Sequence, residues 1–237
     1  MVYTTEDFNR DLAKMTELAR GDKPTDIFLW VQWEMARTHR ALVVFWLQVR
    51  KQFSTSAPVD DAENFLGFAK QWVRSVELHH QLEEEVQFPA LNPPVDTGKS
   101  HDEHVELMQP LQAYKSYLES VSSGSESWSA YKADELTQAF IPIMMRHFVE
   151  ELYILDPDAL RKFIPKETLE GMRQDVAETA KVRLDPARDV PPLVTHNDDA
   201  LDWPPVPWKI TEDFKIPLEL YQPHKGWWKY SSHPLEL

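Results

Sequence analysis

Residues 77–89, which read ELHHQLEEEVQFP, decide how the rest of this chain is interpreted. They place two histidines one helical turn before two glutamates, in the pairs His79 with Glu83 and His80 with Glu84. Side chains four residues apart lie on the same face of a helix, so the members of either pair can act together. The stretch therefore predicts a long helix that carries imidazoles and carboxylates side by side.

The residues around the two pairs indicate which pair faces the core. The helical face through His79 and Glu83 continues through large apolar residues such as Trp72, whereas the face through His80 and Glu84 continues through polar ones. A helix in a globular protein buries its apolar stripe against its neighbours. We therefore expect His79 and Glu83 to point inward, and we expect His80 and Glu84 to lie on the wetter face.

A second pair with the same spacing, His147 and Glu151, and two single histidines, His39 and His104, lie on three other predicted helices. An inward glutamate has a large desolvation cost unless it is paired or bound to a metal ion. With the pair at positions 79 and 83, these residues make four imidazoles and two carboxylates, a ligand set that suits iron, manganese or zinc. The sequence thus predicts a dinuclear metal site, and the competing interpretation is that the acids meet arginines such as Arg146.

The apolar periodicity predicts an all-α fold, an up-down bundle of four long helices with extra helices at both ends. Ser100 and Glu103 have the spacing of a capping box at the start of the third long helix, and Pro142 is expected to kink the fourth. The long helices are expected at residues 27–52, 60–90, 100–121 and 127–155, and the extra ones at residues 5–20, directly after Asp156-Pro157, and at residues 166–183.

From Asp185 onward the composition changes. The last 53 residues hold nine of the 18 prolines and four of the nine tryptophans, with little helical periodicity. We expect residues 1–184 to form one helical domain with its core at residues 26–155. We expect residues 185–237 to form an extended tail that is packed on the bundle through its aromatic side chains.

Charge and cysteine content exclude several classes of protein. A net charge of −14 argues against a nucleic-acid partner, and the absence of cysteine excludes disulfides, iron–sulfur clusters and thiolate zinc sites. No apolar run approaches the length of about 18 residues that indicates a membrane span, and the polar N-terminus does not read as a secretion signal. We therefore expect a cytoplasmic protein without a membrane partner, whose metal ligands are nitrogen and oxygen atoms.

Four places in the sequence carry a resemblance to a known family. They are His39 in RTHRAL, the stretch HHQLEEEVQFP at residues 79–89, His104 in DEHVEL, and HFVEE at residues 147–151. With these motifs, about Asp26 to Leu155 resembles the hemerythrin-like, or HHE cation-binding, family. The resemblance implies two iron ions in a non-haem diiron centre that binds or reacts with dioxygen. The ligands that it implies are His39, His79, Glu83, His104, His147 and Glu151, with the two glutamates as bridges.

One departure concerns the number of histidines. Oxygen-carrying members of the family have two histidines four residues apart on the third helix, whereas here His104 is followed at that spacing by Met108. In some members of the wider family an extra ligand stands next to the matching histidine of the second helix, which implies His80 as the replacement. His101 is the alternative, but it lies in the first turn of its helix, so we favour His80.

The sequence leaves the function open between an enzyme and a sensor or carrier, with an acidic helical adaptor that holds an incidental metal as a third possibility. An enzyme would activate dioxygen to oxidise a small organic substrate, whereas a sensor or carrier would bind iron and oxygen without catalysis. No residue outside the ligand set identifies a substrate.

Overall fold

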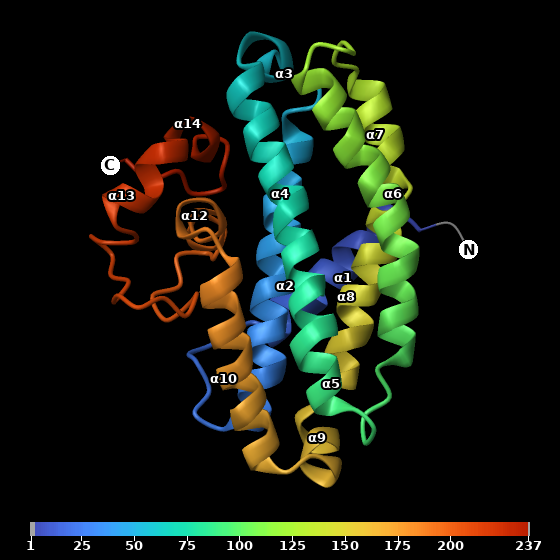
Figure 1. Ribbon diagram of the computed structural model, residues 1–237, viewed down its shortest axis with the longest axis vertical. Coiled ribbons are helices and arrows are strands. Elements are labelled where there is room, and N and C mark those ends of the chain that lie inside the picture. The colour runs from blue at the N-terminus through green and yellow to red at the C-terminus, as the bar shows by residue number, and fades with distance from the viewer. Residues whose placement is uncertain (1–2, 237) are drawn as a thin grey trace. The chain divides into compact units, whose positions relative to one another are not determined.

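The computed structural model describes residues 3–236, and its regular secondary structure is helical, with no β-strand in that part of the chain. The predicted all-α class is confirmed, whereas Met1, Val2 and Leu237, at the ends of the two predicted domains, lie outside the described residues. In chain order the longer helices are α1 (Thr5–Leu18), α2 (Ile27–Lys51), α4 (Ala62–Leu82), α6 (Gly98–Ser122), α7 (Ala130–Gln138), α8 (Ile141–Ile154) and α10 (Lys166–Arg183) (Figure 1). The shorter ones are α3 (Ala57–Asp60), the π-helix η1 (Glu83–Gln87), α5 (Phe88–Leu91), α9 (Pro157–Phe163), α11 (Pro186–Asp189), α12 (Pro191–Thr195), α13 (Leu218–Tyr221), η2 (Gln222–His224) and α14 (Lys225–Trp228). None of the helices within residues 3–236 has the length and apolar character needed to cross a membrane.

The chain divides into two compact units, and each is built from three separate stretches. The first unit contains the described residues up to Arg40, together with residues 77–109 and 139–183. The second contains residues 41–76, residues 110–138 and the described residues from Leu184 onward.

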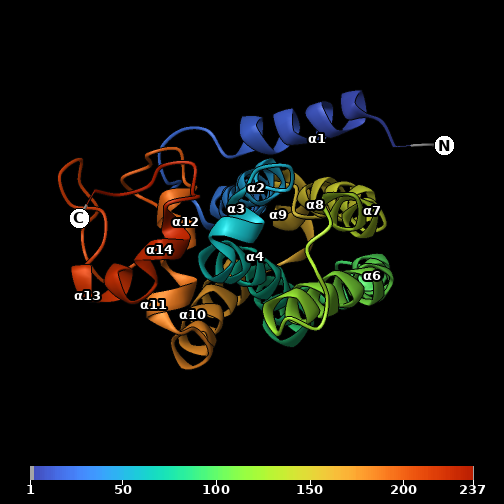
Figure 2. The ribbon, with the colours of Figure 1, turned by 90° about the horizontal axis from the view of Figure 1, so that it is seen from above.

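In the first unit, α1 lies outside α2 and α8 (Figures 1 and 2). A capping box holds its first turn, in which Thr4 and Asp7 exchange hydrogen bonds between side chain and backbone. Arg40 Nε of α2 donates to the Thr16 hydroxyl at 3.0 Å, and Lys14 of α1 lies over the ring of Tyr153 of α8. These contacts fix α1 across the two helices that carry His39 and His147.

The second long helix is interrupted where the sequence predicts continuity over residues 60–90. After α4 ends at Leu82, residues 83–87 form one turn of π-helix, in which backbone hydrogen bonds span five residues, and α5 follows. Apolar periodicity does not reveal such a turn, because it changes the spacing by only one residue. Its buried residue is Glu83, so the irregular turn lies at the carboxylate that the sequence places in the core.

Two other helix boundaries differ from their sequence predictions. The predicted capping box at Ser100 is wrong, because α6 begins two residues earlier, where the Asp96 side chain accepts from the Gly98 N–H at 3.0 Å. Pro142 does not kink a single fourth helix. The helix is interrupted before Ile141, and the proline occupies the first turn of α8. Proline lacks an N–H and clashes with the preceding turn, whereas the first turn of a helix tolerates it.

In the second unit, aromatic side chains form the core. The Trp46 and Trp72 rings lie 4.9 Å apart between centroids, and Trp72 Nε1 donates to the Leu42 carbonyl oxygen at 3.0 Å. A Cβ at Gly67 would lie 2.2 Å from the Trp227 indole nitrogen, so only glycine allows this close approach.

The segment after Leu184 contains the short helices α11–α14, which differs from the extended tail that the sequence predicts. The buried Asp189 carboxylate of this segment forms an ion pair with Arg74 through two hydrogen bonds, both 2.9 Å long. The same carboxylate accepts from Gln71 Nε2 and from the Asp185 N–H, each at 2.8 Å. One carboxylate thus joins α11 to α4 and satisfies four donors.

His196 predicts an acid sensitivity of the second unit. Its fully buried ring is stacked on Phe45 (centroids 4.6 Å apart), and Nδ1 donates to the Pro192 carbonyl oxygen at 2.7 Å. Burial lowers the pKa of His196 from 6.5 to about 3, so between these values the unfolded chain binds a proton that the folded chain does not. The free energy of unfolding should therefore fall as the pH is lowered from about 6.5 towards 3, with a contribution of at most about 1.4 kcal/mol per pH unit. Urea titrations at several pH values should give a flatter profile for His196→Phe, and identical profiles would contradict this.

Candidate metal centre

Seven side chains that the sequence singles out converge in the first unit. All seven are buried, and none is more than 9% exposed. They come from α2 (His39), α4 (His79 and His80), η1 (Glu83), α6 (His104) and α8 (His147 and Glu151). Helices that are distant in the sequence therefore bring imidazoles and carboxylates to one place.

The side chains form two groups that share one carboxylate. The three-histidine group is His80, His104 and His147 with Glu83, and the two-carboxylate group is His39 and His79 with Glu83 and Glu151. Within each group the potential ligand atoms lie within 4.8 Å of one another. Each group is thus compact enough for its members to bind one ion together.

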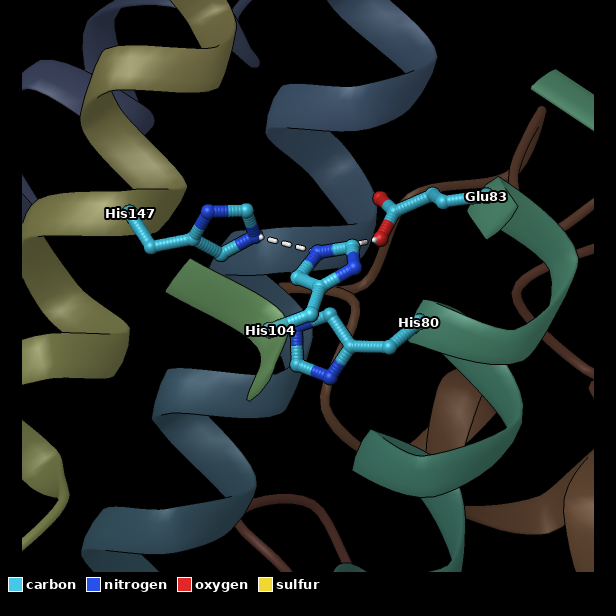
Figure 3. Close-up of side chains that lie close together, drawn as sticks. All are labelled: His80, Glu83, His104 and His147. Carbon is cyan, nitrogen blue, oxygen red and sulfur yellow. Dashed lines mark hydrogen bonds and ion pairs between the residues drawn. The ribbon is translucent and has the colours of Figure 1, made fainter. Parts of the chain in front are cut away.

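Figure 3 shows the three-histidine group, with the side chains of α4, η1, α6 and α8 directed toward one another. His104 Nε2 lies 3.0 Å from His147 Nε2 and 3.5 Å from Glu83 Oε2. The rings of His80 and His104 are 4.4 Å apart between centroids.

The two-carboxylate group uses the other oxygen of Glu83. Glu83 Oε1 lies 3.0 Å from His79 Nε2 and 3.8 Å from His39 Nε2, while Oε2 faces His104. Glu151 Oε2 lies 3.4 Å from His39 Nε2 and 3.7 Å from His147 Nε2, so it also reaches histidines of both groups. Glu83 therefore belongs to both groups, and Glu151, a member of one group, also lies near a histidine of the other.

Unpartnered polar atoms test whether the cluster fits a metal. Within the described part of the chain, these buried atoms lack a hydrogen-bond partner: Nε2 of His39 and His79, both ring nitrogens of His80, both carboxylate oxygens of Glu83, and Oε2 of Glu151. A buried polar atom without a partner costs about 1–3 kcal/mol, so a folded protein rarely leaves several together. Cations that prefer nitrogen and oxygen ligands would satisfy these atoms except for one ring nitrogen of His80, since an imidazole binds an ion through a single nitrogen, and the residues therefore fit a metal.

The contacts do not support the alternative in which the two inward glutamates pair with arginines. The closest charged partners of Glu83 and Glu151 are histidines. Arg146 is exposed and donates to the Pro142 carbonyl oxygen of its own helix at 3.1 Å.

Three of the buried histidines, His79, His80 and His104, are in the protonation state that a metal requires, whereas the pKa of His147 is raised, because its hydrogen bond with Glu103 and the nearby charge of Glu151 outweigh the effect of burial. Burial lowers the pKa of His79 to about 4, and burial together with the charge of His147 lowers the pKa of His104 to about 4. Burial also lowers the pKa of His80. Neutral imidazoles offer a lone pair to a cation without first losing a proton.

The two carboxyl groups differ in the metal-free protein. Burial and the negative charge of Glu151 raise the pKa of Glu83 to about 8. Burial acts to raise the pKa of Glu151, but the nearby His39 ring and the charge of His147 lower it to about 2. The two carboxyl pKa values are thus shifted in opposite directions, and a bound cation would favour the ionised form of both groups.

Three of the histidines are held at the nitrogen that points away from the cluster. His39 Nδ1 donates to the Phe148 carbonyl oxygen at 3.0 Å, His104 Nδ1 to Glu84 at 2.7 Å, and His147 Nδ1 to Glu103 at 3.1 Å. These contacts fix the proton on Nδ1 and leave Nε2 for the cluster. The sequence does not identify Glu84 and Glu103 in this role, and its only signal is that each acid stands next to a predicted ligand.

His80 lies in the cluster and His101 does not. The expectation that His80 faces the wetter side is wrong, because its ring is 3% exposed and lies 5.3 Å from that of His147. Successive helical residues differ by about 100°, so His79 can face His39 of α2 while His80 faces His104 of α6. The His101 side chain is 58% exposed and contacts Glu84 at 2.9 Å, outside both groups.

Comparison with known proteins identifies a family for this chain. Residues 32–157 match the family model described as the hemerythrin HHE cation binding domain. No curated protein and no solved structure matches the chain. The matched range includes all seven side chains of the cluster.

Proposed function

Because this chain belongs to the hemerythrin family of HHE cation-binding domains, we propose that its buried cluster binds two iron ions and that these bind or activate dioxygen. The observation that carries the proposal is the position of Glu83 in both ligand groups, with one oxygen facing His79 and the other facing His104. A carboxylate with one oxygen directed to each ligand group favours the binding of two neighbouring ions over the binding of one. The up-down four-helix bundle predicted for residues 26–155 is part of the same proposal.

The ligand set divides between the two ions. One ion would be held by His80, His104 and His147, the other by His39 and His79, and both by the bridging Glu83 and Glu151. A ferrous iron pair held by these residues would supply electrons to dioxygen. The chain itself supplies neutral imidazoles at His79, His80 and His104 and excludes bulk water, since all seven side chains are buried.

The proposal includes dioxygen as its only substrate. Dioxygen needs no binding group other than the ions that the ligand set would hold. Oxidation of a small organic molecule would need a further binding group beside the cluster. A reversible carrier or sensor and an oxygen-activating enzyme would share the same ligand set, and they would differ in whether the oxidised centre returns to its reduced form when oxygen is removed.

Metal analysis and optical spectra test the proposal. Protein loaded with ferrous iron without oxygen should hold about two ions per chain, and exposure to air should produce new near-ultraviolet and visible absorption. A sample loaded with Zn²⁺, which has no redox chemistry, is the control and should hold the same number of ions without the spectral change. Iron-loaded protein with fewer than two ions per chain, or with no change in air, would contradict the proposal.

A further inference from the structure

Two acids outside the ligand set contact histidines of the same group. Glu84 Oε1 accepts from His104 Nδ1 at 2.7 Å, and Glu103 Oε2 accepts from His147 Nδ1 at 3.1 Å. The two acid side chains are 32% and 19% exposed, so each forms a boundary between the buried rings and the solvent. Both supported histidines belong to the three-histidine group.

Each of the two acids has a second partner on its outer side. The other oxygen of Glu84 contacts His101 Nδ1 at 2.9 Å. Glu103 lies 3.5 Å from Lys99 Nζ, and Lys99 also contacts Glu150 of α8. These outer contacts restrict the acids to the rotamers in which they face the histidines.

The two-carboxylate group is supported in a different way. His39 Nδ1 donates to a neutral acceptor, the Phe148 carbonyl oxygen, at 3.0 Å. A carboxylate acceptor fixes the tautomer of an imidazole as a carbonyl does, but it also raises the basicity of the ligand nitrogen. In the described residues, the charged acceptors for ligand histidines are thus found on the three-histidine group.

We infer that Glu84 and Glu103 are positioning residues that make the three-histidine group the tighter of the two metal subsites. The inference rests on the proposed function, because it assumes two ions. Loss of such an outer partner typically weakens metal binding about 10–100-fold. That effect should fall on one binding step only.

Titration of metal-free protein with Zn²⁺ against a chromophoric chelator tests this by giving two dissociation constants. Glu84→Ala and Glu103→Ala should each raise the smaller constant about 10–100-fold and leave the larger one unchanged. His80→Ala removes a direct member of the group and identifies the step, because it should weaken the same one. Glu84→Gln and Glu103→Gln keep an oxygen that accepts the Nδ1 proton, so they should lose less than the alanine variants.

The matched control is Glu106→Ala, which removes one exposed acid of α6 and should change neither constant. Circular dichroism of each metal-free variant shows whether its helices form, and the glutamine variants carry the test if an alanine variant does not fold. Constants in the four variants equal to those of the control would overturn the inference. A parallel loss in both steps would also overturn it, since the acids would then hold the fold of the unit. Failure of the wild type to bind a second ion would instead refute the proposed function.

Discussion

Replacing Glu83 by alanine should remove most of the bound metal and lower the thermal stability of the metal-loaded protein to that of the metal-free form. Glu83 belongs to both ligand groups, and its two oxygens lie 3.0 Å from His79 Nε2 and 3.5 Å from His104 Nε2. Without it the two cations would face each other with less negative charge between them. Because a metal bound only by the folded state stabilises that state, by about 4 kcal/mol at a thousand times its dissociation constant, metal content and melting temperature should fall together.

In the metal-free protein, Glu83→Ala should raise the thermal stability or leave it unchanged. There the Glu83 carboxyl is buried, and neither of its oxygens has a hydrogen-bond partner. Removing it relieves a desolvation cost of about 1–3 kcal/mol, which offsets the cavity that alanine leaves. Melting curves with and without a chelator, together with metal analysis, measure both effects.

Glu85→Ala is the matched control, because Glu85 lies on the same π-helix but forms an exposed ion pair with Arg183. Such surface pairs contribute about 1 kcal/mol or less, so this variant should retain its metal. The bridging assignment would be wrong if Glu83→Ala kept two ions per chain, or if both variants lost metal equally.

Replacing Asp189 by alanine should destabilise the second unit by about 3 kcal/mol. The Asp189 carboxylate is 4% exposed and satisfies four donors, two of them on the Arg74 guanidinium. Breaking a buried pair on one side leaves the opposite charge without its compensation, which costs about 3–5 kcal/mol. We expect the lower end of that range, because the Arg74 side chain is one-third exposed and water can reach it.

Urea unfolding followed by tryptophan fluorescence measures this loss, and limited proteolysis should cut the segment after Leu184 faster. Asp213→Ala removes an exposed acid from the same segment and should change neither result. In the double variant with Arg74→Leu, the loss should be smaller than the sum of the two single losses, because the unpaired charge is gone as well. Additive losses would show that the ion pair does not hold α11 to α4.

The part of the centre that could be predicted from sequence is the part set by simple helical spacing. His79 with Glu83 and His147 with Glu151 lie on apolar stripes, and both pairs point inward as expected. The burial of His80 could not be read from its own stripe, because it depends on α6 standing opposite α4. That position is a property of the assembled unit and not of one helix.

Other features were missed because a competing local explanation was available. Glu103 has the spacing of a capping-box residue, but α6 starts at Gly98 and frees it to contact His147. A regular helix explains the apolar spacing before Leu82, and nothing in that spacing marks the π-helix that follows. The contacts of Asp189 join positions more than 100 residues apart, and without an alignment no sequence pattern connects them.

The three-stretch construction of the first unit has a consequence for a chain still being made on the ribosome. Glu151 follows His39 by 112 residues, and synthesis adds about 5–20 residues per second, so roughly 6 to 22 seconds separate the two. During that interval His79, His80 and Glu83 exist without α8, and no nascent helix holds a complete ligand group. Metal loading would then follow translation. The histidines of an unfinished chain would be exposed to the most abundant free metal ion in the cell.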